Sequence, residues 1–171
     1  MYDKLHDSAL KSYYFNRSSL AIEPPYGQQW SRAEGHADNE VKVHASAAST
    51  ARPESSMIES TKGWYDAGDY GKYVVNSGIA TYTLLASYEH FPTFYQNRNT
   101  NIPESNDNIP DILNEAKWNI DWLATMQDTD GSVYHKLTTL AWPGKEMPVQ
   151  DKRERFVIGK STPAALDYAA V

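Results

Sequence analysis

Residues 109–127 carry the clearest structural signal in the chain and read Ile109-Pro-Asp-Ile-Leu-Asn-Glu-Ala-Lys-Trp-Asn-Ile-Asp-Trp-Leu-Ala-Thr-Met-Gln127. Apolar side chains recur every three or four positions, the spacing of one face of an α-helix, at Ile109, Ile112, Leu113, Ala116, Ile120, Leu123 and Ala124. Pro110 and Asp111 suit a first helical turn, and Asp128-Thr-Asp-Gly131 is a stop signal. The pattern therefore predicts an amphipathic helix that ends near Gln127.

Three further segments show helical spacing or a helix start. Residues 2–15 and 72–90 carry apolar residues at helical intervals. A last helix is expected to begin near Ser161, where Ser161 or Thr162 can cap the first turn. The short piece 131–137 resembles a strand, but the pattern predicts no sheet. We therefore expect an all-α chain of about four helices.

Long polar segments separate these helices, at 16–63, 91–108 and 129–160. Loops of this length inside a domain commonly carry function. The chain ends in Ala-Ala-Val without a helix stop signal, and its mean hydropathy of -0.65 is low for a self-sufficient core. We therefore expect residues 1–171 to form part of one larger domain.

The composition argues against several classes of protein. The 171 residues include 16 Lys and Arg against 22 Asp and Glu, a formal charge of -6. This balance argues against nucleic acid and membrane surfaces as partners, and no apolar run approaches the ~18 residues that span a bilayer. Without cysteine, the chain has no disulfide, no thiolate nucleophile and no cysteine-ligated zinc.

The densest group of reactive side chains lies in Gly63-Trp-Tyr-Asp-Ala-Gly-Asp-Tyr-Gly-Lys-Tyr73. Only alanine and glycine separate Asp66 from Asp69, so the backbone can turn tightly and both carboxylates can converge on one water or ion. Two carboxylates on one water can hold it and remove its proton, which is the general-base half of an inverting glycosidase. Trp64 and Tyr65 supply aromatic faces of the kind on which sugar rings stack.

Structural interpretations compete at these positions. Asp69 can cap the helix that follows it, and Asp66 can form an Asx-turn. Trp118 and Trp122 lie four residues apart on a predicted helix, so we assign them to the core. The Asp-x-x-Asp spacing by itself does not decide between catalysis and structure.

Four stretches together resemble glycoside hydrolase family 9, the cellulases and related β-glucanases. They are the 63–73 motif, Ala9-Leu-Lys-Ser-Tyr-Tyr-Phe-Asn-Arg17, the 109–127 helix with the following Asp-Gly-Ser-Val-Tyr-His-Lys136, and Ser161-Thr-Pro-Ala-Ala-Leu-Asp-Tyr-Ala-Ala170. They occur in the family's order and cover nearly the whole chain. The resemblance implies an (α/α)6 barrel, of which residues 1–171 would form an incomplete, N-terminal part of the single catalytic domain.

The resemblance also implies roles for single residues. Asp69 is expected to be the catalytic base that activates the attacking water, and Asp66 to help hold that water. His135 is expected to contact sugar hydroxyls near the cleavage point, with a hydrogen-bonded structural histidine as the alternative. Tyr65 and Trp64 are expected either to line the cleft or to pack beneath the loop.

The resemblance bears on metals as well. His36 falls where some family members have a Cys-His pair that binds a structural zinc, and because this chain has no cysteine we expect no such zinc. No cofactor is expected to be required. Structural calcium stays open without assigned ligands, because no calcium-loop spacing is present.

The family's general acid is a glutamate near the end of a longer catalytic domain, and Glu115 is no substitute because it lies within the buried-helix pattern. We therefore expect the parent protein to hydrolyse β-1,4-glucan with inversion, as a cellulase-type endoglucanase, and the 171-residue chain alone to be inactive. Secretion, or a periplasmic location, is expected because an insoluble polymer cannot enter a cell. Two alternatives stay open: a non-catalytic carbohydrate-binding fragment, and another β-glycan hydrolase of the exo-glucosaminidase type on the same barrel.

Overall fold

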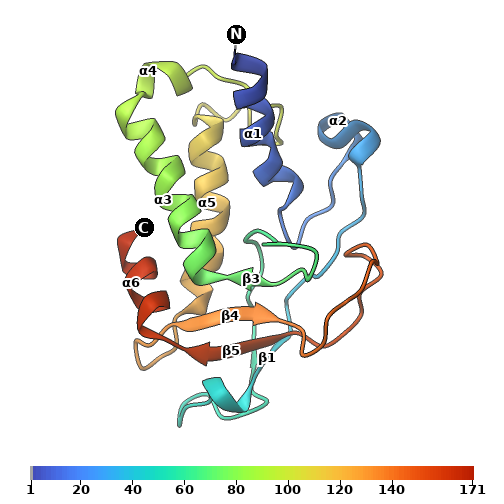
Figure 1. Ribbon diagram of the computed structural model, residues 1–171, viewed down its shortest axis with the longest axis vertical. Helices are drawn as coiled ribbons and strands as arrows, with labels where there is room; N and C mark the ends of the chain where they lie inside the picture. Colours follow the sequence, from blue (N-terminus) through green and yellow to red (C-terminus); the bar gives the residue numbers. More distant parts are fainter. Residues whose placement is uncertain (1) are drawn as a thin grey trace.

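Helices form one layer of the molecule and stand on a small mixed sheet at one end (Figure 1). The computed structural model describes residues 2–171. The longer helices are α1 (Asp3–Phe15), α3 (Val74–His90), α5 (Asp111–Leu123) and α6 (Thr162–Ala170), and the short ones are α2 (Pro24–Gly27) and α4 (Pro92–Tyr95). The strands are β1 (Val41–Val43), β2 (Met57–Ile58), β3 (Lys72–Tyr73), β4 (Tyr134–Thr138) and β5 (Phe156–Lys160). Single 3-10 turns lie at Gln28–Trp30, Ala45–Ala47 and Ala124–Met126.

The helix predicted over 109–127 is present as α5 and the 3-10 turn that continues it. Ile112, Ala116 and Leu123 of the predicted apolar face are buried. The last helix also begins as predicted, because the Ala164 N–H donates to the Ser161 hydroxyl in the cap position. No helix in residues 2–171 is both long enough and apolar enough to cross a membrane.

The expectation of an all-α chain is wrong. Within residues 2–171, five strands form one mixed sheet in the order β2-β1-β5-β4-β3. β5 pairs antiparallel with β4 and parallel with β1, where Lys42 lies opposite Phe156. The strands have only two to five residues, too few for alternation to be read, and β1 pairs with a segment far away in sequence. The described residues do not show the (α/α)6 barrel that the resemblance implies.

Strand β3 takes the first two residues of the helix predicted over 72–90. Tyr73 pairs with Lys136 of β4 and has an extended backbone, so α3 begins one residue later at Val74. Because β3 is the last strand in the sheet order, the segment before it reaches the sheet at an edge. The loop that carries Asp66 and Asp69 therefore lies where the sheet edge meets the start of α3 (Figure 1).

Two of the three apolar clusters of buried residues within residues 2–171 join these layers, and the third, Tyr14, Ile22 and Ile102, lies beside α1. The first lies between the sheet and the helices and is formed by Val41, Val43, Ala47, Val74, Trp122, Leu123, Met126, Val133, Tyr134, Leu137, Val157 and Ala164. The second joins α1, α3 and α5 and is formed by Leu10, Trp64, Leu84, Tyr95, Ile112 and Ala116. Because Trp64 belongs to the second core, the helices hold the start of the loop that carries the aspartates.

Gly63 passes so close to α5 that a side chain there has no room. Its φ is +78°, and a Cβ at this position would lie 2.7 Å from Cγ of Trp122, which is fully buried. We expect Gly63→Ala to lower the free energy of unfolding by about 1–3 kcal/mol, measured by urea denaturation. Gly68→Ala is the control, because a Cβ there meets nothing within 4 Å. Equal stability of the Gly63→Ala and wild-type chains would contradict this close contact.

Candidate active site

A tight loop connects Trp64 to β3. The Asp66 N–H donates to the Gly71 carbonyl at 2.9 Å, and the Tyr70 N–H donates to the Ala67 carbonyl at 3.0 Å. Tyr70 adopts the left-handed conformation, with φ of 54°. Both aspartates therefore project from one closed turn, as the small residues between them predict.

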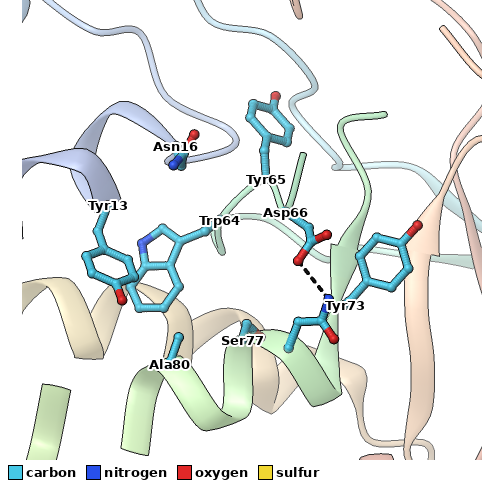
Figure 2. A pocket seen from close by; sticks show the side chains of 9 residues that line it. Tyr13, Asn16, Trp64, Tyr65, Asp66, Tyr73, Ser77 and Ala80 are labelled. Carbon is cyan, nitrogen blue, oxygen red and sulfur yellow. Dashed lines mark hydrogen bonds between the residues drawn. The ribbon is translucent and has the colours of Figure 1, made fainter. Parts of the chain in front are cut away.

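The two carboxylates have different partners. Asp66 is exposed, and its Oδ1 accepts a hydrogen bond from Asn76 Nδ2 at 2.8 Å (Figure 2). Asp69 is half-buried, and its Oδ2 accepts from the Tyr73 hydroxyl at 2.6 Å while its Oδ1 accepts from the Gly71 N–H at 3.1 Å. Neither carboxylate takes part in an ion pair within residues 2–171. Neither is therefore committed to a salt bridge.

The helix-cap interpretation of Asp69 does not hold. Tyr73 occupies the cap position of α3, and no side chain accepts a hydrogen bond there. The backbone bond from two residues later, typical of an Asx-turn, is made to Asp69 and not to Asp66. Burial and the hydrogen bond to Asp69 raise the pKa of Tyr73 to about 12. Tyr73 therefore stays protonated near neutral pH and donates to Asp69.

A pocket of about 170 Å³ opens beside Asp66. Figure 2 shows the Asp66 carboxylate between Trp64 and Tyr73, next to the first turns of α3. The lining residues come from α1, the loop and α3, and are Tyr13, Asn16, Trp64, Tyr65, Asp66, Tyr73, Asn76, Ser77 and Ala80. A wider hollow of about 660 Å³ shares Tyr65 and Asn16 with this pocket and is also lined by Phe15, Trp30, Arg32, Ala67, Gly68, Tyr70, Met147 and Pro148.

Three of the predicted site residues meet in the smaller pocket, namely Asp66, Trp64 and Tyr65. Trp64 and Tyr65 are only 5% and 6% exposed, so they pack beneath the loop as well as lining the pocket. The Trp64 ring packs on Tyr13 with centroids 4.8 Å apart. Asp69 does not line this pocket, but it is hydrogen-bonded to Tyr73, which does.

His135 lies apart from this pocket, on β4. Its Nδ1 is 2.9 Å from the Ser161 hydroxyl that caps α6. Its neighbour Lys136 pairs with Tyr73, so His135 lies close in the sheet to the strand that follows the loop. In the described residues, the hydrogen bond to Ser161 is the contact expected of a structural histidine.

Glu115 is enclosed, as its place in the helix pattern predicts. Its Oε1 lies 2.8 Å from Arg17 Nη2, and its Oε2 accepts from Trp64 Nε1 at 3.2 Å. Burial raises its pKa to about 7, against the opposing effect of Arg17. Because it lies beneath Trp64 and does not line the pocket, Glu115 supports the pocket wall without reaching a ligand.

The sequence analysis did not assign six of the pocket residues to the site, namely Tyr13, Asn16, Tyr73, Asn76, Ser77 and Ala80. Tyr73 and Asn76 follow Asp69 by four and seven residues, where the chain passes through β3 into the first turn of α3. The sequence signal that could have identified Asn76 was its amide side chain in the first turn of α3, seven residues after Asp69. Tyr13 and Asn16 lie at the end of α1, inside a stretch that carries the family resemblance, but no local pattern connects them to the loop.

A buried ion cluster holds the loop from beneath. Asp38 Oδ2 lies 2.8 Å from Lys72 Nζ, and its Oδ1 lies 3.0 Å from Arg155 Nε. Arg155 Nη1 donates to the Tyr70 carbonyl at 2.7 Å. Although burial acts in the opposite direction, Lys72 and Arg155 hold the pKa of Asp38 below its ordinary value, and burial lowers the pKa of Lys72 to about 8. The loop is therefore tied to segments around residues 38 and 155.

The residues present do not fit a zinc site at His36. Its Nδ1 is hydrogen-bonded to the Tyr65 hydroxyl at 3.0 Å, and its Nε2 lies 3.2 Å from Asp151 Oδ2 without hydrogen-bond alignment, so both ring nitrogens face side chains of this chain. No group of three or more His, Asp or Glu side chains in the part of the chain that the structure describes could hold a metal ion. The chain also has no cysteine to supply a sulfur ligand.

Comparison with known proteins gives the family. Residues 2–171 match the family described as Glycosyl hydrolase family 9. The chain belongs to glycosyl hydrolase family 9. It is 51% identical to the Xyloglucan-specific endo-beta-1,4-glucanase BoGH9A of Bacteroides ovatus over 168 residues, and this alignment covers 98% of this chain and 29% of that protein. It is 38% identical to the Cellulose 1,4-beta-cellobiosidase of Acetivibrio thermocellus over 196 residues, and this alignment covers 99% of this chain and 22% of that protein.

Solved structures of family 9 proteins share the fold. The structure titled Bacteroides ovatus GH9 has a TM-score of 0.95 at 50% identity, over 97% of this chain and 30% of that chain. A metagenome-derived glycoside hydrolase family 9 endoglucanase has a TM-score of 0.88 at 37% identity, over 97% of this chain and 30% of that chain. The family resemblance seen in the sequence is confirmed. The chain spans less than a third of the length of these family 9 relatives.

Proposed function

We propose that the protein carrying this chain is a family 9 endoglucanase that hydrolyses β-1,4-glucan with inversion. Residues 1–171 form the N-terminal part of its catalytic domain and supply the base side of the active site. The observation that carries the proposal is the projection of Asp66 and Asp69 from one closed turn beside an aromatic-walled pocket. The glucanase names of the relatives support the substrate class.

Asp69 acts as the base that removes a proton from the attacking water, and Asp66 holds that water. Tyr73 donates to one oxygen of Asp69, and the Asn76 amide orients Asp66. An inverting reaction needs an acid on the other side of the glycosidic bond, ~6.5–9.5 Å from the base. The family resemblance implies that this acid is a glutamate near the end of the longer catalytic domain, outside residues 1–171, and the enclosed Glu115 does not replace it. The scheme uses proton transfers between carboxyl groups and water and requires no cofactor.

The sugar-binding side of the proposal rests on aromatic surfaces. Trp64 and Tyr65 form walls of the smaller pocket, and Trp30, 67% exposed, stands in the wider hollow across the loop. His135 contacts sugar hydroxyls near the point of cleavage. Since one relative is named as specific for xyloglucan, both branched and unbranched β-1,4-glucans are substrates to test. A polymeric substrate places the enzyme outside the cell or in the periplasm.

The isolated 171-residue chain is expected to release no reducing sugar from soluble β-glucan or xyloglucan, because it lacks the acid. It is expected to bind cello-oligosaccharides, seen as a change in tryptophan fluorescence, because Trp64 lines the pocket. Trp64→Phe is expected to reduce that change, whereas Trp142→Phe, at an exposed residue outside both hollows, serves as the control. Hydrolysis of glucan by the isolated chain would contradict the proposal that the base lies in residues 1–171 and the acid outside them.

A further inference from the structure

His36 and Asp151 meet behind the loop that carries the two aspartates. They come from irregular segments, yet their side chains are 3% and 0% exposed. His36 Nε2 lies 3.2 Å from Asp151 Oδ2, and Arg153 Nε donates to Asp151 Oδ1 at 2.7 Å. Irregular segments normally run over the surface, and a buried carboxylate requires partners. The buried contact between His36 and Asp151 therefore holds these two irregular segments together behind the loop.

The other ring nitrogen of His36 reaches Tyr65. Nδ1 lies 3.0 Å from the Tyr65 hydroxyl, and the His36 backbone N–H donates to the same oxygen at 3.2 Å. Burial and the nearby Arg155 lower the pKa of His36, so the ring is neutral at pH 7 and carries one N–H. Because the Asp151 carboxylate can only accept, that N–H is on Nε2, and the Tyr65 hydroxyl donates to Nδ1. A hydrogen bond between Tyr65 and His36 and a close polar contact between His36 and Asp151 therefore connect these three residues, a set that we call the histidine bridge.

Tyr65 connects the histidine bridge to the catalytic loop. It directly precedes Asp66, and its ring packs edge-on against Tyr70 with centroids 5.2 Å apart. The His36 ring lies 5.7 Å from the Tyr70 ring and 5.6 Å from the Tyr65 ring. The His36 ring therefore packs against Tyr65 and Tyr70, which lie near the two ends of the loop. A change in the position of Tyr65 would move the backbone that carries both carboxylates.

We propose that the histidine bridge takes the place of a structural metal in this chain and fixes the conformation of loop 65–71. His36 and Asp151 are then positioning residues for Asp66 and Asp69. The donor set supports this, because the His36 ring nitrogens face the Tyr65 hydroxyl and the Asp151 carboxylate, and no group of three or more His, Asp or Glu side chains in the described residues could hold a metal ion. Only the catalytic consequence rests on the proposed function, and the conformational consequence does not depend on it.

Amide hydrogen exchange of the chain tests the conformational claim directly. The Asp66 and Tyr70 N–H groups close the loop through their bonds to Gly71 and Ala67. Tyr65→Phe removes only the hydroxyl that meets His36. We expect it to speed exchange of these two amides about tenfold, because the hydrogen bonds that the buried hydroxyl makes with His36 are lost, and to leave the amides of α5 unchanged.

Matched variants separate the histidine bridge from a general loss of stability. Tyr82→Phe is the control, because Tyr82 is 53% exposed on α3. Asp151→Asn keeps an acceptor for His36 Nε2–H, so it is expected to speed loop exchange less than Asp151→Leu. Unchanged loop exchange in Tyr65→Phe would overturn the proposal. Equal acceleration in the loop and in α5 would overturn it too, because the histidine bridge would then support the whole fold.

Two further measurements test the metal and the catalytic consequence. Elemental analysis after incubation with zinc sulfate and desalting is expected to find substoichiometric zinc, and stoichiometric zinc would overturn the proposal. In the full-length enzyme, His36→Gln is expected to lower kcat about tenfold with KM unchanged, because loop position affects the reacting groups and not the uniform binding of substrate. Faster loop exchange with unchanged kcat would overturn the positioning role. A full-length enzyme inactive on every glucan, with loop exchange as expected, would reject the proposed function and support the histidine bridge.

Discussion

Replacing Asp69 with asparagine in the full-length enzyme is expected to lower kcat on β-glucan by about 10²–10⁴-fold, the usual contribution of a general base. Asparagine has nearly the same shape and keeps an oxygen that can accept from the Tyr73 hydroxyl, but it cannot take a proton from water. Binding of cello-oligosaccharides is therefore expected to persist. Initial rates of reducing-sugar release and calorimetric binding measure the two quantities separately.

Asp130→Asn is the matched control for this substitution. Asp130 is an exposed carboxylate whose Oδ1 accepts from the Ser132 N–H, outside the proposed machinery. Its replacement is expected to leave kcat unchanged. Retained turnover in Asp69→Asn would remove Asp69 from the role of base. Loss of both turnover and binding would assign it a structural role instead.

Asp38→Asn is expected to lower the free energy of unfolding by about 3–5 kcal/mol at pH 7, because it leaves two buried cations without their anion. Lys72 is completely buried and Arg155 is 6% exposed, and both contact the Asp38 carboxylate. Since Arg155 also donates to the Tyr70 carbonyl, loop 65–71 is expected to loosen as well. Urea denaturation of the chain measures the difference.

The pH dependence of this difference follows from the lowered pKa of Asp38. The folded chain holds the pKa below its ordinary value of 3.8, so the ionised carboxylate stabilises the fold above that pH. This contribution is lost as the pH falls through the folded pKa. The gap between wild type and Asp38→Asn is therefore expected to be full at pH 7 and to shrink in acid.

Glu154→Gln is the control for Asp38→Asn. Glu154 pairs with Lys42 at the surface, and an exposed pair contributes only ~0–1 kcal/mol. An Asp38→Asn effect on the free energy of unfolding no larger than that of Glu154→Gln would show that the buried cluster does not stabilise the fold.

The helices could be predicted from the sequence because their signals are local. The apolar spacing that gives α5 and the hydroxyl that caps α6 both lie within a few residues of the structure they specify. The sheet could not be predicted in this way. β1 has three residues, and its parallel partner β5 lies at the other end of the chain. The sequence of neither strand predicts that it pairs with the other.

The candidate site divides in the same way. Asp66 and Asp69 stood out because alanine and glycine between them allow a tight turn, and that turn is present. Tyr13 and Asn16 line the pocket because α1 packs against the loop, which is a tertiary contact that the local sequence does not predict. His36, Asp38, Asp151 and Arg155 show no spacing that links them to residues 65–71, and the contacts between them are entirely tertiary.

The sequence by itself determined the helices α5 and α6, the family and the turn with two carboxylates, since each depends on residues close together along the chain. Tertiary structure alone decided the mixed sheet, the pocket beside Asp66 and the buried groups beneath the loop. The physical reason is burial. His36, Asp38 and Lys72 are removed from water together, so each needs a charged or hydrogen-bonding partner that only a distant segment of the folded chain provides.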